Sequence, residues 1–259
     1  MMNLAQLRET YPRQTIDAGG TPVEIVRTRG AGPALLLLPG AQGTAESFYR
    51  QLLTFGPQRD MLSINYPGLD DMTRLADLMI AVADAQGIGT FDIVGSSLGG
   101  YVAQWVAARH PDRVDRLVVG NSFHDPRPSQ SPEKLASLVN RSAEQVKLEI
   151  LERLLAAPDS EFRQVMLDLM GVQQTAAGLR SRMLAVQRAA VLEGAALDPD
   201  RLLLIECDND PLIPPSSRQA ARERFPRATV ASIPGGGHYP YILKAEAYNQ
   251  AIAAFLGMH

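Results

Sequence analysis

Cysteine, net basic charge and long apolar runs are all scarce in this sequence, and each scarcity excludes a class of protein. Cys207 is the only cysteine among 259 residues, so no disulfide can form within the chain and a reducing, cytoplasmic setting is expected. The formal net charge of −3 provides no basic face for nucleic acid. The longest aliphatic run, at 34–38, is far shorter than a membrane span, and no signal-peptide pattern opens the sequence. We therefore expect a cytoplasmic protein without nucleic-acid partners or a membrane span.

Metal-ligating side chains and nucleotide-binding glycine patterns are scarce as well. Four histidines and one cysteine are scattered along the chain, with no cluster that has the spacing of a metal site. The glycine-containing stretch at 95–100 lacks the Gly-x-Gly-x-x-Gly spacing of a dinucleotide site. We therefore expect chemistry that needs neither a metal ion nor a cofactor.

What the sequence does contain is a regular series of short apolar runs separated by helical patterns. Residues with a 3.6-residue period fill most of the intervals between these runs, which indicates helices. Strands buried on both faces by such helices read as continuous apolar runs, and the runs at 34–38 and 201–205 do. The sequence predicts a mostly parallel α/β sheet with helices on both faces. The expected strands contain residues 23–26, 34–38, 61–65, 91–94, 116–120, 201–207 and 228–233.

This alternation stops between about Pro126 and Pro199, where several helical segments follow one another. We interpret 126–198 as a helical cap inserted into a core formed by 1–125 and 199–259. Such a cap can lie over the carboxyl ends of the strands, where ligands bind in α/β sheets. Three methionines of the insert are candidates for lining an apolar pocket, although core filling is the favoured interpretation. They are Met166, Met170 and Met183.

A candidate nucleophile lies between an expected strand and an expected helix. Ser97 occupies the centre of a Gly-x-Ser-x-Gly pattern, with Gly95 and Gly99 two residues away on either side. A tight strand-to-helix turn exposes the serine oxygen, and the flanking glycines tolerate the crowded backbone. Ser96 lacks this spacing and is interpreted as a small spacer. The N–H of Leu98, at the helix start, is placed to donate to an oxygen on which negative charge develops.

A serine hydroxyl needs a base, and a third group must orient that base. His238 is the favoured base, because it follows the expected strand at 228–233 in a glycine-rich loop. The other histidines are His110, in a helix-stop pattern, His124, just after a strand, and the terminal His259. The orienting acid should also follow a strand, and Asp208 and Asp210 both come just after 201–207. Either assignment gives the chain order serine, aspartate, histidine.

This order, together with the turn around Ser97, resembles the α/β-hydrolase fold enzymes along nearly the whole chain. In that family, the loop after the first buried strand usually reads His-Gly-x, and the x backbone N–H completes an oxyanion hole. The chain reads Pro39-Gly40-Ala41 there, so the resemblance assigns the second donor to Ala41 and marks Pro39 as a departure. The family's Gly-x-x-Asp-x-x-x-Pro segment matches 207–214, with Cys207 in place of the glycine.

The match to that segment implies Asp210 as the acid and Asp208 as its less favoured neighbour. Some members of this fold take the acid from the end of the preceding strand, which keeps Asp125 as a third candidate. A turn-capping role before Pro126 is the favoured interpretation of Asp125.

The segments at 38–52, 96–104 and 118–126 also look like those of the maspardin-like branch. Maspardin is understood as an interaction protein that lacks the histidine of this loop, whereas this chain keeps His238. The resemblance therefore implies a serine hydrolase that forms an acyl-enzyme from a small or medium carboxylic ester or related acyl compound. Thioesters, lactones and C–C bonds stay open as substrates, as does a cofactor-free perhydrolase. The alternative from another class is a maspardin-like interaction module with a vestigial site.

Overall fold

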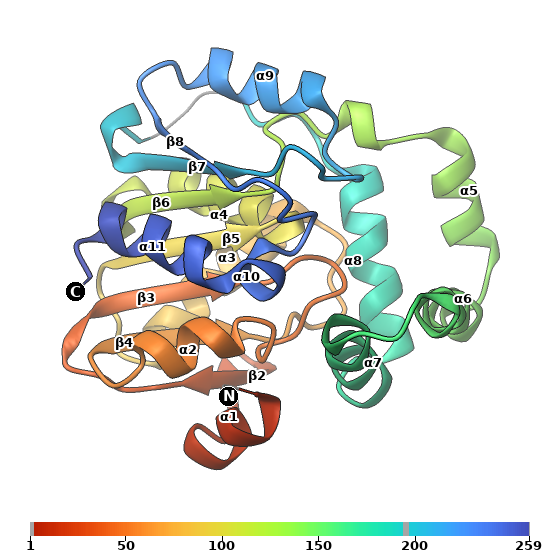
Figure 1. Ribbon diagram of the computed structural model, residues 1–259, viewed down its shortest axis with the longest axis horizontal. Helices are drawn as coiled ribbons and strands as arrows, with labels where there is room; N and C mark the ends of the chain where they lie inside the picture. The colour runs from red at the N-terminus through yellow and green to blue at the C-terminus, as the bar shows by residue number, and fades with distance from the viewer. Residues whose placement is uncertain (1–2, 194–196, 259) are drawn as a thin grey trace.

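The computed structural model describes residues 3–193 and 197–258, and it is built around one eight-stranded sheet (Figure 1). The strand order is β1-β2-β4-β3-β5-β6-β7-β8. β1, β2 and β4 pair antiparallel, and every pair from β4 and β3 through β7 and β8 is parallel. The strands are β1 (Gln14–Ala18), β2 (Thr21–Arg27), β3 (Gly32–Leu38), β4 (Arg59–Ile64), β5 (Phe91–Ser96), β6 (Val114–Gly120), β7 (Leu202–Glu206) and β8 (Thr229–Ser232).

Helices cover both faces of this sheet. α3 and α4 pack into one apolar cluster with the sheet, and α1, α2 and α11 pack into the other. The helices of the core are α1 (Leu4–Thr10), α2 (Tyr49–Phe55), α3 (Met72–Ala85), α4 (Leu98–Arg109), α9 (Pro215–Arg224), α10 (Pro240–Leu243) and α11 (Ala245–Leu256).

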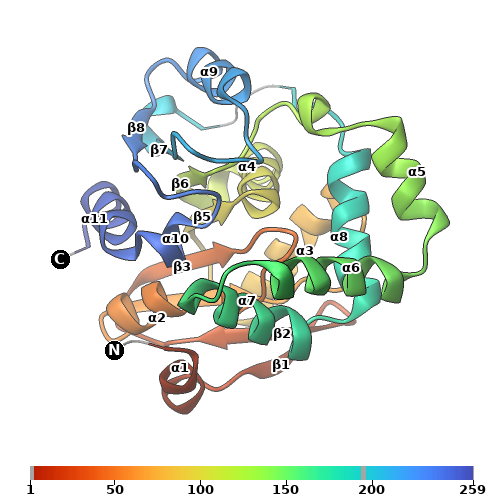
Figure 2. The ribbon, with the colours of Figure 1, turned by 45° about the vertical axis from the view of Figure 1, so that its right-hand side comes forward.

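Four more helices follow one another between β6 and β7. They are α5 (Pro132–Asn140), α6 (Ala143–Ala156), α7 (Glu161–Val172) and α8 (Ala176–Arg188). Figures 1 and 2 both show them gathered on one side of the sheet, at the ends of the strands. We call these four helices and the turns between them the cap; the division of the chain at 126–198 into a separate domain stays a prediction.

The central strand β3 shows why the parallel part of the sheet reads as continuous apolar sequence. Leu36 and Leu38 belong to the cluster on one face, and Leu35 and Leu37 belong to the cluster on the other. All four side chains are fully buried. Burial of each leucine contributes about 2 kcal/mol, and both faces of the strand receive it. The predicted α/β class is confirmed by this arrangement.

The expected strands are all present, and the structure adds two elements that the apolar pattern did not indicate. β1 is an edge strand with only its last residue, Ala18, buried, so it carries no apolar run. α1 buries only Leu4 and Leu7. Helix α8 ends at Arg188, although the helical pattern of the sequence continues from Thr175 to Leu192. Short or half-exposed elements give weak periodicity, which explains why these were missed or overextended.

The register of the parallel strands brings their carboxyl ends to one edge. Leu38 of β3 lies opposite Gly95 of β5, and Ser96 lies opposite Gly120 of β6. Gly120 in turn lies opposite Ile205 of β7. Loops that leave these strands therefore meet beneath the cap.

In the described ranges of the chain, no helix is both long and apolar enough to cross a membrane.

Candidate active site

Ser97 is the single residue between the end of β5 and the start of α4. Its backbone angles, φ 54° and ψ −122°, lie in a region that L-residues rarely adopt. The chain turns so sharply that a Cβ on Gly95 would lie 2.2 Å from the Gly99 carbonyl oxygen, and a Cβ on Gly99 would lie 2.0 Å from that of Leu38. Only glycine fits at these two positions, which explains the Gly-x-Ser-x-Gly spacing.

Hydrogen bonds hold the strained Ser97 backbone in place. Its N–H donates to the Gly120 carbonyl at 3.0 Å, and its carbonyl accepts from the Ser122 hydroxyl at 2.6 Å. Leu98 is the first residue of α4, so its N–H has no partner one turn earlier in the helix. That N–H and the positive end of the helix are therefore available to an oxyanion.

The loop that follows β3 lies directly against Ser97. A Cβ on Gly40 would approach the Ser97 Cβ to 3.2 Å, and Ala41 shares a cavity with Ser97. The loop predicted to supply the second oxyanion donor is thus next to the candidate nucleophile, with Pro39 in the place of the usual histidine.

His238 and Asp210 form a buried pair. The Nδ1 atom of His238 lies 2.9 and 3.0 Å from the two Asp210 carboxylate oxygens. Their side chains are 5% and 0% exposed. Asp210 also accepts from the N–H groups of Leu212 and Ile213, at 2.8 and 3.1 Å. The Nε2 atom of His238 has no hydrogen-bond partner in the described part of the chain, and the ring faces the cavity that Ser97 lines.

Asn121 is a further residue of this site, which the analysis of the sequence missed. It follows β6 with a φ of 43°, and its Nδ2 atom donates to the Asp210 carboxylate at 2.8 Å and to the Gly237 carbonyl at 3.0 Å. Its Oδ1 atom accepts from the Cys207 thiol at 3.7 Å. An asparagine directly after a strand-ending glycine was the available signal, because asparagine tolerates positive φ better than other non-glycine residues.

These contacts set the charge of the acid. Burial acts to raise the pKa of the Asp210 carboxyl, but the hydrogen bonds from His238 and Asn121 and the charge of His238 outweigh it, so the pKa lies below its ordinary value. Asp210 is therefore ionised at neutral pH. Burial raises the pKa of the Cys207 thiol, which keeps that sulfur neutral beside the acid.

The other acid candidates have different partners. Asp208 accepts from the Gly235 N–H at 2.9 Å and so braces the glycine-rich loop that carries the histidine. Asp125 accepts from the Arg127 backbone N–H at 2.9 Å and pairs with the Arg127 guanidinium within its own turn. Of the three candidate aspartates, only Asp210 contacts His238.

The remaining histidines lie elsewhere. His110 lies 3.3 Å from the Asp77 carboxylate, outside the cavity. His124 is partly buried, and burial lowers the pKa of its imidazole. His259 lies outside the described residues. Across the described ranges, no group of three or more His, Cys, Asp or Glu side chains is placed to hold a metal ion.

The cavity between the sheet edge and the cap has a volume of about 680 Å³. Its floor includes Ala41, Ser97 and His238. Met166 and Met170 are buried in the core, as expected, whereas Met183 packs partly buried against that core and also lines the cavity. The apolar side chains that the cap contributes to the wall are Leu138, Val146, Ile150, Met183 and Val186.

The chain resembles known proteins in sequence and in fold. Human maspardin is 23% identical over 253 residues, which cover 93% of this chain and 82% of maspardin. RutD of Caulobacter segnis, to which carbamate hydrolysis has been attributed, is 26% identical over 198 residues, 73% of this chain and 74% of RutD. A thermophilic esterase from Thermogutta terrifontis superposes with a TM-score of 0.76 at 23% identity, over 95% of this chain and 98% of its own, and so shares the fold. A model of the alpha/beta hydrolase family matches residues 35–254. The match covers most of the chain, and the chain therefore belongs to the alpha/beta hydrolase family.

Proposed function

We propose that this chain is a serine hydrolase that cleaves a small or medium carboxylic ester, or a related acyl compound, through an acyl-enzyme. The observation that carries the proposal is the buried pair of His238 and Asp210, whose imidazole faces the cavity beside the strained Ser97. A base oriented by a carboxylate is what a serine hydroxyl needs in order to attack a carbonyl.

In the proposed mechanism, Ser97 Oγ attacks the carbonyl carbon while Nε2 of His238 takes the hydroxyl proton. The N–H groups of Ala41 and Leu98 donate to the resulting oxyanion. His238 then gives the proton to the leaving oxygen as its bond to carbon breaks, which leaves the acyl group on Ser97. In the second half, His238 takes a proton from a water molecule, which attacks the acyl carbon. His238 then returns the proton to Ser97 Oγ as its bond to that carbon breaks, and the carboxylic acid product is released. Asp210 stabilises the imidazolium throughout and stays ionised.

The cavity supports a substrate of modest size. Its volume of about 680 Å³ lies within the range of about 300–1,000 Å³ that small-molecule sites occupy. The wall formed by the cap is mixed: its apolar side chains can take up an acyl or alkoxy group, and charged side chains lie beside them. The charged side chains are Glu133, Lys134, Arg141, Glu149 and Arg153. A carbamate presents a similar carbonyl carbon, and the likeness to RutD makes it a second compound to test.

The decisive experiment compares the wild type with Ser97→Ala on p-nitrophenyl esters from acetyl to palmitoyl and on a carbamate. We expect the wild type to cleave the short esters, and Ser97→Ala to lower kcat by at least about a thousandfold, because the three groups act as a unit. The matched control is Ser96→Ala, which changes the neighbouring serine and should retain activity.

Labelling with a fluorophosphonate separates the two classes of function. The hydrolase should be labelled at Ser97 and lose activity in proportion. An interaction module with a vestigial site predicts neither turnover nor labelling. Unchanged turnover in Ser97→Ala would contradict the assignment of the nucleophile.

A further inference from the structure

We propose that Arg182 and Gln174, two buried residues of the cap, are positioning residues that clamp the loop at 40–43 and so aim the Ala41 N–H at the reacting carbonyl oxygen. The proposal rests on the hydrolase function proposed above. It assigns to the cap a part in transition-state stabilisation, in addition to forming the wall of the cavity.

Arg182 lies on α8 and reaches across to the core. Its Nε atom donates to the Ala41 carbonyl at 2.8 Å, and its Nη1 atom donates to the Tyr66 carbonyl at 3.2 Å. Its Nη2 atom donates to the Gln174 side-chain oxygen at 2.5 Å. The planar guanidinium thus uses three donors at once and fixes the position of the Ala41 carbonyl.

Gln174, just before α8, holds the next part of the same loop. Its amide nitrogen donates to the Gln42 carbonyl and, at 3.0 Å, to the Gly43 carbonyl. Gln174 is 6% exposed and Arg182 is 4% exposed. Three consecutive carbonyls, of residues 41 to 43, are therefore held by two side chains of the cap.

The peptide groups on both sides of Ala41 are fixed as a result. The Gly43 N–H donates to the Gly40 carbonyl at 2.9 Å, which sets the peptide that carries the Ala41 N–H. In a trans peptide the N–H points opposite to the C=O, so this N–H is directed away from the turn. No hydrogen-bond acceptor for the Ala41 N–H lies in the described part of the chain. Arg182 locks the following peptide through the Ala41 carbonyl.

The burial of Arg182 indicates a role beyond stability. In the described ranges no carboxylate pairs with it, although burial of an unpaired cation is costly. Burial lowers the pKa of Arg182 to about 10, so the guanidinium stays charged at neutral pH. A buried cation that binds the carbonyls of an oxyanion loop adds positive potential where negative charge develops. Pro39 offers no side-chain donor for the loop, and the cap residues provide donors instead.

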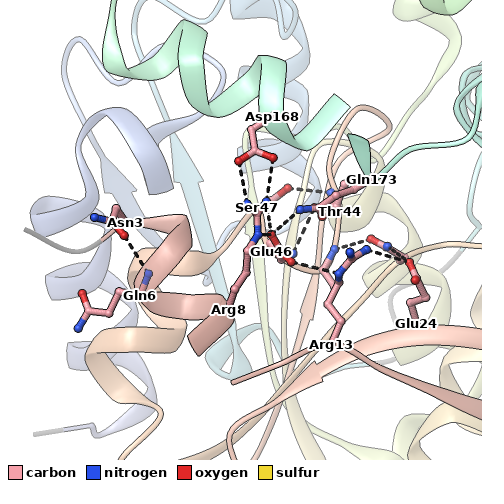
Figure 3. Close-up of polar contacts among 12 residues, drawn as sticks. Asn3, Gln6, Arg8, Arg13, Glu24, Thr44, Glu46, Ser47, Asp168 and Gln173 are labelled. Atoms are coloured by element: carbon pink, nitrogen blue, oxygen red, sulfur yellow. Dashed lines mark hydrogen bonds and ion pairs between the residues drawn. The ribbon is translucent and has the colours of Figure 1, made fainter. Parts of the chain in front are cut away.

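The far end of the loop is anchored by a second polar cluster, shown in Figure 3. Glu46 is 1% exposed and accepts from Gln173 of the cap at 2.5 Å and from Arg8 of α1 at 2.8 Å. Arg8 also forms two hydrogen bonds, each 2.9 Å, with Asp168 of α7. The cap is thus tied to the core at residues 41–43 and again at Glu46.

The test compares Arg182→Met and Gln174→Leu with the wild type on the best p-nitrophenyl ester. We expect Arg182→Met to lower kcat at least about tenfold, up to the loss of about 10²–10³-fold that removal of the oxyanion donor itself causes. Gln174→Leu should cost about tenfold, because it frees two carbonyls but leaves Arg182 on Ala41. KM should change less than about threefold in both, because the lost interaction strengthens only in the transition state.

The matched control is Arg163→Met, which removes a cap arginine whose partners, the Ala157 carbonyl and Asp159, lie within the cap. It should retain the wild-type kcat. Thermal unfolding of all variants establishes that they are folded. Equal kcat in Arg182→Met and Arg163→Met, or a change confined to KM, would overturn the clamp.

Hydrogen exchange of the 40–43 amides provides a readout that needs no activity. Arg182→Met should speed exchange in this segment by at least about tenfold, and Arg163→Met should leave it unchanged. If the wild type neither turns over esters nor reacts with a fluorophosphonate, the proposed function fails, and the exchange result still decides whether the clamp exists. Equal exchange in the two variants would refute it.

Discussion

At the scale of single residues, the three aspartates near the cavity differ in what they hold. Asp210 contacts the imidazole of His238 and is held in turn by Asn121. Asp208 braces a loop amide, and Asp125 pairs with Arg127 in its own turn. An orienting carboxylate keeps the histidine in the right tautomer and stabilises its charged form, which neither Asp208 nor Asp125 is placed to do.

We therefore expect Asp210→Asn to lower kcat by about 10⁴-fold while the protein stays folded. Asp208→Asn and Asp125→Asn should each stay within about tenfold of the wild type, the size of one pKa unit of lost interaction. Steady-state kinetics on one short ester, with circular dichroism of each variant, measure this. If Asp125→Asn were inactive and Asp210→Asn active, the orienting acid would be Asp125, after the end of β6.

At the scale of elements, the turn between β5 and α4 requires the backbones of β3, β5 and α4 to approach one another closely. α4 packs against β3 through Gly99, whose missing side chain lets the Leu38 carbonyl approach. Because both partners in this contact are backbone, a side chain at 99 cannot be accommodated by a rotamer change. The helix itself would have to move away from the sheet.

Gly99→Ala should therefore destabilise the protein by about 3 kcal/mol, the upper part of the range for overpacking. The control is Gly89→Ala, at an exposed position where a Cβ would meet nothing within 4 Å. It should stay within about 0.5 kcal/mol of the wild type. Urea unfolding curves give both free energies, and equal values for the two variants would show that the backbone contact is not limiting.

At the scale of the whole molecule, the two ends of the sheet have different tasks. The candidate site lies at the carboxyl ends of the strands, and a buried ion pair between Arg59 and Asp92 lies at the amino ends of β4 and β5. Burial raises the pKa of the Asp92 carboxyl, and the Arg59 guanidinium offsets this only in part. This pair belongs to the stability of the fold and has no contact with the cavity.

Asp92→Ala should cost about 3–5 kcal/mol of unfolding free energy, because it leaves the buried Arg59 charge without its partner. Its kcat per folded molecule should equal that of the wild type. The control is Asp84→Ala, whose pair with Arg113 is exposed and is worth at most about 1 kcal/mol. Denaturant titration and active-site titration of the same samples test this, and a fall in kcat would show that the two ends are coupled.

The sequence by itself determined the class of the fold and the place of the candidate nucleophile. Both features depend on short stretches of sequence. A strand buried on both faces needs a continuous apolar run, and the turn at Ser97 needs glycines two residues away on either side. The family resemblance is likewise confirmed by the match over residues 35–254. The catalytic roles of Ser97, Asp210 and His238 stay predictions.

Only the tertiary structure decided which side chains meet. The position after the strand fits Asp208 and Asp210 alike, and the family segment favoured Asp210; the structure shows that Asp210 is the one that contacts His238. Asn121 reaches Asp210 across 89 positions, and Arg182 reaches Ala41 across 141. Such contacts depend on strand order, register and the docking of the cap, none of which is encoded in the residues next to either partner. Local periodicity determines elements, whereas the packing of distant elements determines the site.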